Sequence, residues 1–74
     1  MLAQRNARRR YLIYNDGVVT FTLVYEDDGE WHVERTGTGG ALARLTLREF
    51  ETSSTGKKLA VQLSAAVSEA QEDL

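Results

Sequence analysis

Residues 18–36 read VVTFTLVYEDDGEWHVERT, and this stretch decides the fold of the chain. Large apolar side chains alternate with smaller or polar ones before and after its acidic centre, which is the period of two expected of half-buried strands. The centre itself, Asp27-Asp28-Gly29, has the composition of a tight turn. We therefore predict two antiparallel strands, at residues 18–26 and 31–36, joined by this turn.

The length of the turn determines which side chains face the core. A two-residue loop at residues 28–29 would place His32 on the apolar side of the sheet. A three-residue loop at residues 27–29 pairs Tyr25 with Trp31, and it gives glycine the left-handed position that such loops require. Because a shift of one residue moves every side chain to the other face, we predict the three-residue loop.

A second turn signal, NDG at residues 15–17, follows the short apolar run YLIY. The same type of three-residue loop pairs Tyr11 with Phe21 and Ile13 with Val19. The pattern then predicts a single apolar face for the whole sheet. This predicted core face consists of Tyr11, Ile13, Val19, Phe21, Leu23, Tyr25, Trp31 and Val33.

The segment at residues 41–47 (ALARLTL) is compatible with two structures. Its alternating alanines and leucines favour a fourth strand. Thr46 and Glu49 also have the spacing of a capping box, which favours a helix start at that point. We predict a short strand at about residues 41–45 and a helix that has Thr46 as its N-cap.

The C-terminal third carries an apolar stripe at helical spacing. Phe50 and Leu59 are separated by about 2.5 turns at 3.6 residues per turn, so an unbroken helix would place them on opposite faces. Residues 52–56 (TSSTG) are also poor helix formers. We favour a break near residues 53–56 over a continuous helix that buries two faces, and we predict the main amphipathic helix at about residues 56–71.

These elements predict one small α+β domain over residues 1–74, in which residues 1–9 are a basic N-terminal arm. Its fold is an antiparallel meander of three to four strands with a C-terminal amphipathic helix packed on one face. A domain of this size buries only about 60% of the surface of its unfolded chain, so its stability is marginal. The helix leaves Leu12, Val18 and Val24 on the opposite face, where a second copy would cover them.

The composition excludes several kinds of chemistry. The chain has no cysteine and one histidine, His32, which removes disulfides, thiol nucleophiles and a zinc site built from Cys and His ligands. Because His32 is expected to face away from the core, the serines of the C-terminal third lack an imidazole base. We expect no enzymatic activity, no cofactor and no metal. No apolar run approaches the roughly 20 residues of a membrane span, and we expect a cytoplasmic protein without membrane contact.

Charge is unevenly distributed along the chain. The first ten residues hold four arginines and no acid, whereas all 11 acidic residues lie beyond them. Arginine side chains contact phosphates and a neighbouring tyrosine can stack on bases. The acidic isoelectric point of about 5.3 argues against nucleic acid as the partner. The candidate nucleic-acid-binding residues are Arg5, Arg8, Arg9, Arg10 and Tyr11.

No local motif identifies a family. The order of elements, strands followed by a C-terminal helix opened by Leu45-Thr46-Leu47, resembles that of the dimeric single-stranded-DNA-binding transcriptional coactivators over about residues 10–70. The acidic body departs from that family, and no binding residue is carried over from it. The sequence thus favours a small non-catalytic protein-interaction module that self-associates as a homodimer or binds another protein. The alternative is a nucleic-acid-binding protein that uses the arginine-rich arm.

Overall fold

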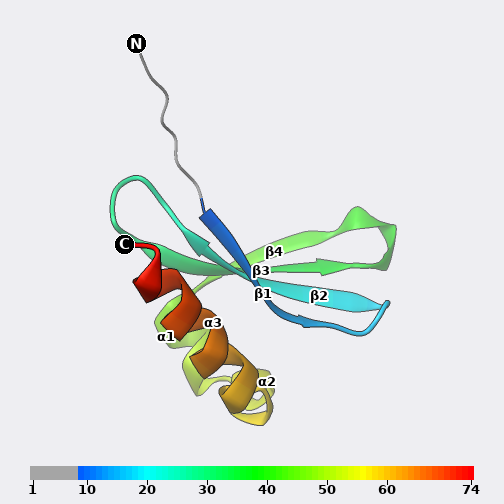
Figure 1. Cartoon of the computed structure of the whole chain (residues 1–74). Coiled ribbons are helices and arrows are strands. Elements are labelled where there is room, and N and C mark those ends of the chain that lie inside the picture. The colour runs from blue at the N-terminus through cyan, green and yellow to red at the C-terminus, as the bar shows by residue number, and fades with distance from the viewer. Residues whose placement is uncertain (1–8) are drawn as a thin grey trace.

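The computed structural model describes residues 9–74, which form a four-stranded antiparallel sheet followed by helices (Figure 1). The sheet is a meander in the order β1-β2-β3-β4. Its strands are β1 (Arg9–Asn15), β2 (Val19–Tyr25), β3 (Trp31–Gly37) and β4 (Leu42–Thr46). The α-helices are α1 (Leu47–Thr52), α2 (Ser54–Lys58) and α3 (Ala60–Glu72), and a short 3-10 turn, η1 (Thr38–Gly40), joins β3 to β4. The predicted α+β class and the meander are confirmed.

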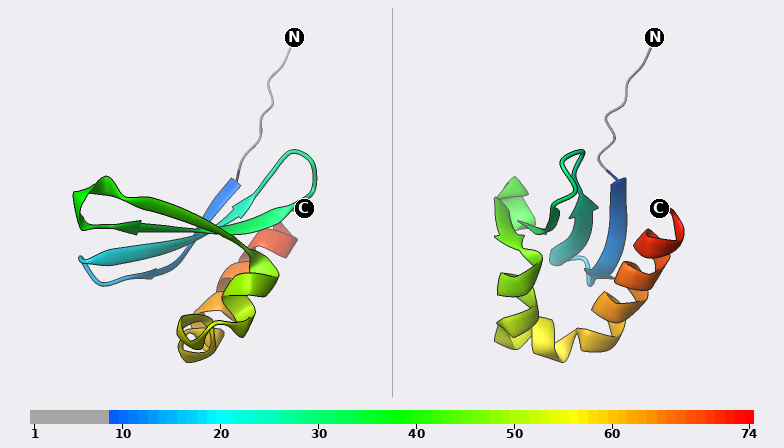
Figure 2. Two further views of the ribbon diagram at one scale, coloured as in Figure 1. Left: turned by 180° about the vertical axis from the view of Figure 1, so that it is seen from behind. Right: turned by 90° about the vertical axis from the view of Figure 1, so that its left-hand side faces the viewer.

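All three α-helices lie on the same side of the sheet, as the two views of Figure 2 show. Helix α3 packs mainly against β1, and α1 packs against β4 and β3. Helix α2 connects them at the end farthest from the sheet. The turns that join β1 to β2 and β3 to β4 project beyond the helices (Figure 1). The sheet therefore has one face that the helices cover and one that no described helix touches.

The core lies between the sheet and the helices, and Phe50 of α1 is its largest fully buried side chain. The rings of Phe50 and Phe21 lie 5.2 Å apart between centroids. Tyr25 is half-buried and its ring lies 4.6 Å from that of Trp31. The predicted core face is confirmed for the buried Tyr11, Ile13, Phe21, Leu23 and Val33, with Val19 and Trp31 packed against them.

The second hairpin has the predicted register. Tyr25 pairs with Trp31, and the three-residue loop between Glu26 and Glu30 is closed by a backbone hydrogen bond of 2.9 Å. Gly29 has a φ of 87°, the left-handed conformation that this loop requires. Alternation and turn chemistry point to the same register here, which explains why the sequence predicts it.

The first hairpin differs from the prediction. Tyr11 pairs with Leu23 rather than with Phe21, and Ile13, which was expected opposite Val19, falls in a β-bulge. The bulge adds one residue to β1, so the pairing beyond it is displaced. Ile13 still points toward the helices and is buried. The predicted pairs are therefore wrong, although the predicted face is right.

The physical reason for this difference is the turn at the end of the first hairpin. The Asn15 side chain accepts a hydrogen bond from the Gly17 amide, and the Asp16 carboxylate accepts one from each of the amides of Val18 and Val19, all at 2.9 Å. The amide of Asp16 donates a backbone hydrogen bond of 3.3 Å to the carbonyl of Val19, which leaves a loop of two residues, Gly17 and Val18, between the bonded pair. Two side chains that cap the same turn stabilise this two-residue loop over the three-residue one.

The C-terminal segment breaks twice rather than once. Thr46 and Glu49 form the predicted capping box at the start of α1, and the first break falls at Ser53, as predicted. Leu59 has non-helical backbone angles and separates α2 from α3, so the main helix begins at Ala60 instead of near residue 56. Gly56 permits the close approach of α2 to the end of α1, because a Cβ atom there would lie 1.8 Å from the carbonyl oxygen of Phe50.

Candidate interaction surface

The face of the sheet that carries no helix is the main candidate surface, and we call it the helix-free face. In each strand the side chains alternate between the two faces. The register therefore places next to one another on this face the side chains of Arg10, Leu12, Thr20, Thr22, Val24, His32, Glu34, Thr36, Leu42, Arg44 and Thr46. The helix-free face is thus a mixture of charged, polar and apolar groups.

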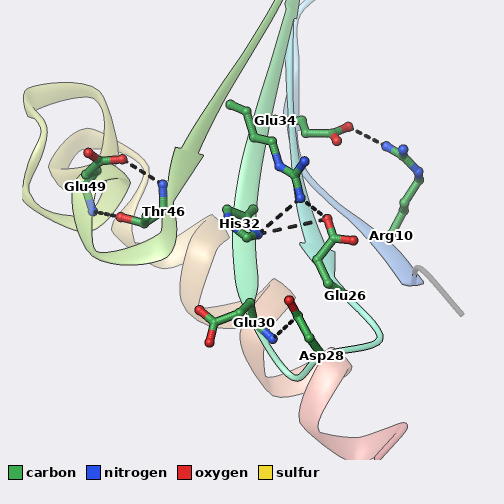
Figure 3. A network of polar contacts seen from close by, with 9 residues as sticks. Arg10, Glu26, Asp28, Glu30, His32, Glu34, Thr46 and Glu49 are labelled. Carbon is green, nitrogen blue, oxygen red and sulfur yellow. Dashed lines mark hydrogen bonds and ion pairs between the residues drawn. The ribbon is translucent and has the colours of Figure 1, made fainter.

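A network of opposite charges occupies one half of the helix-free face (Figure 3). Arg10 donates a hydrogen bond of 2.6 Å to the carboxylate of Glu34. The side chain of Glu34 is only 6% exposed, whereas that of Arg10 is 49% exposed. A buried carboxylate requires such a partner, because an unpaired buried charge is strongly destabilising.

A second group in the same network joins β4 to the end of β2. The guanidinium of Arg44 pairs with Glu26, and it also lies 3.4 Å from Nδ1 of His32 (Figure 3). Nδ1 of His32 lies 4.0 Å from the Glu26 carboxylate. The Glu26 side chain is 16% exposed and that of Arg44 is 46% exposed. In both pairs the acid is the more buried member, so the guanidinium groups form the outer surface.

Val24 shows what this network does to the sheet. The sequence predicts Val24 as an exposed apolar side chain, yet it is fully buried on a face that carries no helix. Its neighbours in the register are Arg10 and His32. Long polar side chains bury apolar surface beneath their stems while their ends stay in water. The prediction that Val24 is exposed is therefore wrong. Polar and charged side chains cover it on this face, as the helices cover the apolar side chains of the other face.

The remaining apolar residues of this region are exposed. Leu12 is 61% exposed and Leu42 is 63% exposed on the helix-free face, and Val18 is 64% exposed at the tip of the first hairpin. Leu12 and Val18 match the prediction of open apolar surface. The exposure of Leu42 was not predicted, because its face is defined only once β4 is paired with β3.

The two edges of the sheet are different. Strand β1 begins with two arginines, contains the bulge at Ile13 and packs on α3, and these features protect an edge from further pairing. Strand β4 pairs regularly with β3, from His32 opposite Thr46 to Thr36 opposite Leu42. Four of its five residues are exposed, and the chain has no proline. The outer side of β4 is therefore the open edge of the sheet.

The helices contain a separate hollow of about 580 Å³ that is lined by residues of α1, α2 and α3. Ser64 and Ser68 open onto it, together with Glu51 and Lys57. His32 lies on the helix-free face, on the other side of the sheet. The fold therefore separates the imidazole from these serines instead of bringing them together for nucleophilic catalysis.

The structure distributes the candidate nucleic-acid-binding residues over different surroundings. Arg5 and Arg8 lie outside the described residues. Arg9 donates a hydrogen bond of 2.6 Å to the backbone carbonyl of Asp73, at the end of α3. Arg10 takes part in the network of the helix-free face, and Tyr11 is buried in the core.

The hydroxyl of Tyr11 also contacts the end of α3. It donates a hydrogen bond of 2.8 Å to the Asp73 carboxylate, and this bond raises the pKa of Tyr11, with a further contribution from burial. Arg9 and Tyr11 thus contact α3, whereas Arg10 points to the opposite face of the sheet. The three residues form no common surface.

Within residues 9–74, no three acidic or histidine side chains are grouped so that they could hold a metal ion. No helix in the same range is long and apolar enough to cross a membrane. Comparison with protein-family models, with curated proteins and with solved structures finds no match to this chain.

Proposed function

We propose that this chain is a small non-catalytic protein-interaction module that self-associates as a homodimer. The observation that carries the proposal is the open edge of the sheet at β4, beside which the side chain of Leu42 is 63% exposed on the helix-free face. Burying a leucine side chain contributes about 1.5–3 kcal/mol. Since small domains have a total stability of only about 5–15 kcal/mol, association would add substantially to it.

The charge pattern supports a second copy as the partner. The helix-free face pairs Arg10 with Glu34 and Arg44 with Glu26, so it carries both signs of charge. A two-fold symmetric interface brings the same residues of both subunits together, so the charges beside the joined edge of one copy lie next to those of the other. Because both signs of charge are present there, the two copies can meet without the repulsion that charges of one sign would produce.

The non-catalytic part of the proposal is supported by the separation of His32 from the helical serines described above. The cytoplasmic location expected from the composition stays a prediction. The proposed lack of catalysis and the predicted location do not depend on the oligomeric state.

The mass in solution tests the proposal. Light scattering at increasing micromolar concentrations should give a mass approaching twice the 8.3 kDa of the chain. The expected dependence on concentration distinguishes a reversible dimer from aggregation. A mass of one chain throughout, together with no binding to other proteins, would contradict the proposed function.

A further inference from the structure

We infer that two copies join edge to edge through β4, antiparallel and about a two-fold axis at Ala43, so that one continuous sheet spans both copies. This inference rests on the proposed self-association and names the surface that carries it. It starts from the open edge, which is free of bulges, carries no helix along its outer side in the described chain and lies partly on a hairpin that projects beyond the helices (Figure 1).

The hydrogen-bond pattern of β3 and β4 determines which backbone groups point outward. The amide of Gly37 donates to the carbonyl of Ala41, so this pair is hydrogen-bonded. Hydrogen-bonded and non-hydrogen-bonded pairs alternate along an antiparallel ladder. Ala43 therefore directs its amide and carbonyl toward β3. Leu42 and Arg44 direct theirs away from the sheet, where a second strand can bind them.

Only a few registers let these outward groups pair with a second copy. Placing Arg44 opposite itself would bring two like charges together, which is destabilising. Placing Leu42 opposite itself would set Arg44 against Gly40, which lies in a turn with a φ of 81° and is not part of a strand. Thr46 also directs its backbone groups outward, but its amide already donates a hydrogen bond of 2.8 Å to the side chain of Glu49. Pairing Leu42 with the partner's Arg44 uses the other two outward residues of each copy and avoids both problems.

Ala43 lies on the axis in this register. It faces Ala43 of the partner subunit in a non-hydrogen-bonded pair, where Cα atoms approach to about 4.5 Å, and the small side chain suits so close an approach. On the covered face, Ala41 comes opposite the partner's Leu45. The helix-free faces of the two copies then lie on the same side of the joined sheet, with Leu42 beside the aliphatic stem of the partner's Arg44.

Single cysteines test this register, because the chain has no cysteine of its own. Ala43 is exposed, so Ala43→Cys should fold. Its Cα separation across the axis falls within the range of about 4.4–6.8 Å that a disulfide spans. Mild oxidation at micromolar concentration should convert Ala43→Cys to a covalent dimer. Val61→Cys, 79% exposed on α3, is the matched control and should remain largely monomeric in a denaturing gel.

Two further variants define the register. Leu42→Cys alone and Arg44→Cys alone should cross-link poorly, whereas an equimolar mixture of the two should give the mixed dimer. Efficient cross-linking of either variant with itself, or failure of Ala43→Cys to cross-link while the parent mass is dimeric, would overturn the inferred register and leave self-association standing. A monomeric parent would overturn both proposals.

Proline at position 42 provides an independent readout. Ala41 has φ −62° and ψ 129°, which suits a residue before proline, and the Leu42 amide points away from β3. Leu42→Pro should therefore leave the fold intact, as circular dichroism can verify, and weaken association at least tenfold relative to Leu42→Ala. Equal association of these two folded variants would contradict pairing through this edge.

Discussion

The hydroxyl of Tyr11 donates a 2.8 Å hydrogen bond to the carboxylate of Asp73, so the first strand is tied to the residue that ends the last helix. Arg9, two residues earlier, donates to the carbonyl of the same Asp73. A cation near the C-terminus of a helix also interacts favourably with the helix dipole. These two contacts hold the end of α3 against β1.

The Tyr11–Asp73 bond predicts a loss of stability at alkaline pH. The bond raises the pKa of Tyr11 above its ordinary value of 10.0, so the folded state favours the neutral phenol. The stabilisation is complete below pH 10 and disappears as the pH rises through the raised pKa. Urea unfolding should show Tyr11→Phe less stable than the parent at neutral pH, with the difference shrinking above pH 10.

Tyr25→Phe is the matched control for this prediction. The Tyr25 ring packs on that of Trp31, and its hydroxyl makes no hydrogen bond within residues 9–74. Its stability difference from the parent should be small at neutral pH. A difference for Tyr11→Phe that is equally small would show that the bond to Asp73 contributes nothing to stability.

Asp16 predicts the opposite dependence on pH. Hydrogen bonds from the backbone amides of Val19 and Val18 lower the pKa of Asp16 below its ordinary value of 3.8. Its contribution is therefore present above that value and is lost as the pH falls through the lowered pKa. Asp16→Ala should be less stable than the parent at pH 7, and thermal unfolding should show the two converging in acid.

Asp27 in the other hairpin turn is the control for Asp16. Its side chain makes no hydrogen bond within the described part of the chain, so Asp27→Ala should melt close to the parent. If Asp27→Ala and Asp16→Ala lost stability equally, the capping of the first turn would not explain its two-residue loop.

Gly56 predicts an effect that runs against helix propensity. Alanine in place of glycine usually stabilises a helix by about 1 kcal/mol. At Gly56 the added Cβ would meet the backbone carbonyl of Phe50 at 1.8 Å, and overpacking of this kind costs about 1–3 kcal/mol or more. Chemical denaturation should therefore show Gly56→Ala as destabilised. Gly37→Ala, where nothing lies within 4 Å of the new atom, is the control and should lose less stability.

The alternative function, nucleic-acid binding through the arginine-rich arm, also stays a prediction that can be measured. It requires affinity for labelled oligonucleotides that falls steeply with salt and is lost when Arg5, Arg8, Arg9 and Arg10 become alanine. Because Arg9 and Arg10 also make contacts in the fold, the variant Arg5→Ala/Arg8→Ala separates binding from stability. Absence of binding to single- and double-stranded oligonucleotides at low salt would remove this alternative.

The first two hairpins of the meander show how far the sequence predicts the sheet. In the second, alternation and Gly29 indicate the same register, and the prediction is right. In the first, the turn depends on two side chains, Asn15 and Asp16, that cap it together, and the bulge at Ile13 compensates for the change in loop length. A bulge leaves the apolar pattern almost unchanged, so the pattern cannot reveal it.

The candidate surface was harder to predict than the core. The sequence predicts one amphipathic helix, which can cover only one face of the sheet, so it also predicts an open apolar face. Leu12 and Val18 are exposed as expected. The charge network is different, because Arg44 reaches Glu26 only after β4 has paired with β3. The pairing of β4 with β3 determines which charged side chains lie close enough to form ion pairs. The pattern of residues in a single sequence contains little information about that pairing.

Hydrogen exchange along β4, measured by NMR at a dilute and a concentrated condition, tests the central claim most directly. The amides of Ala43 and Leu45 point toward β3 and should be protected at both concentrations. Those of Leu42 and Arg44 should become protected only in the concentrated sample, as the second copy binds. Unprotected Leu42 and Arg44 amides in a sample whose mass is dimeric would contradict association through this edge.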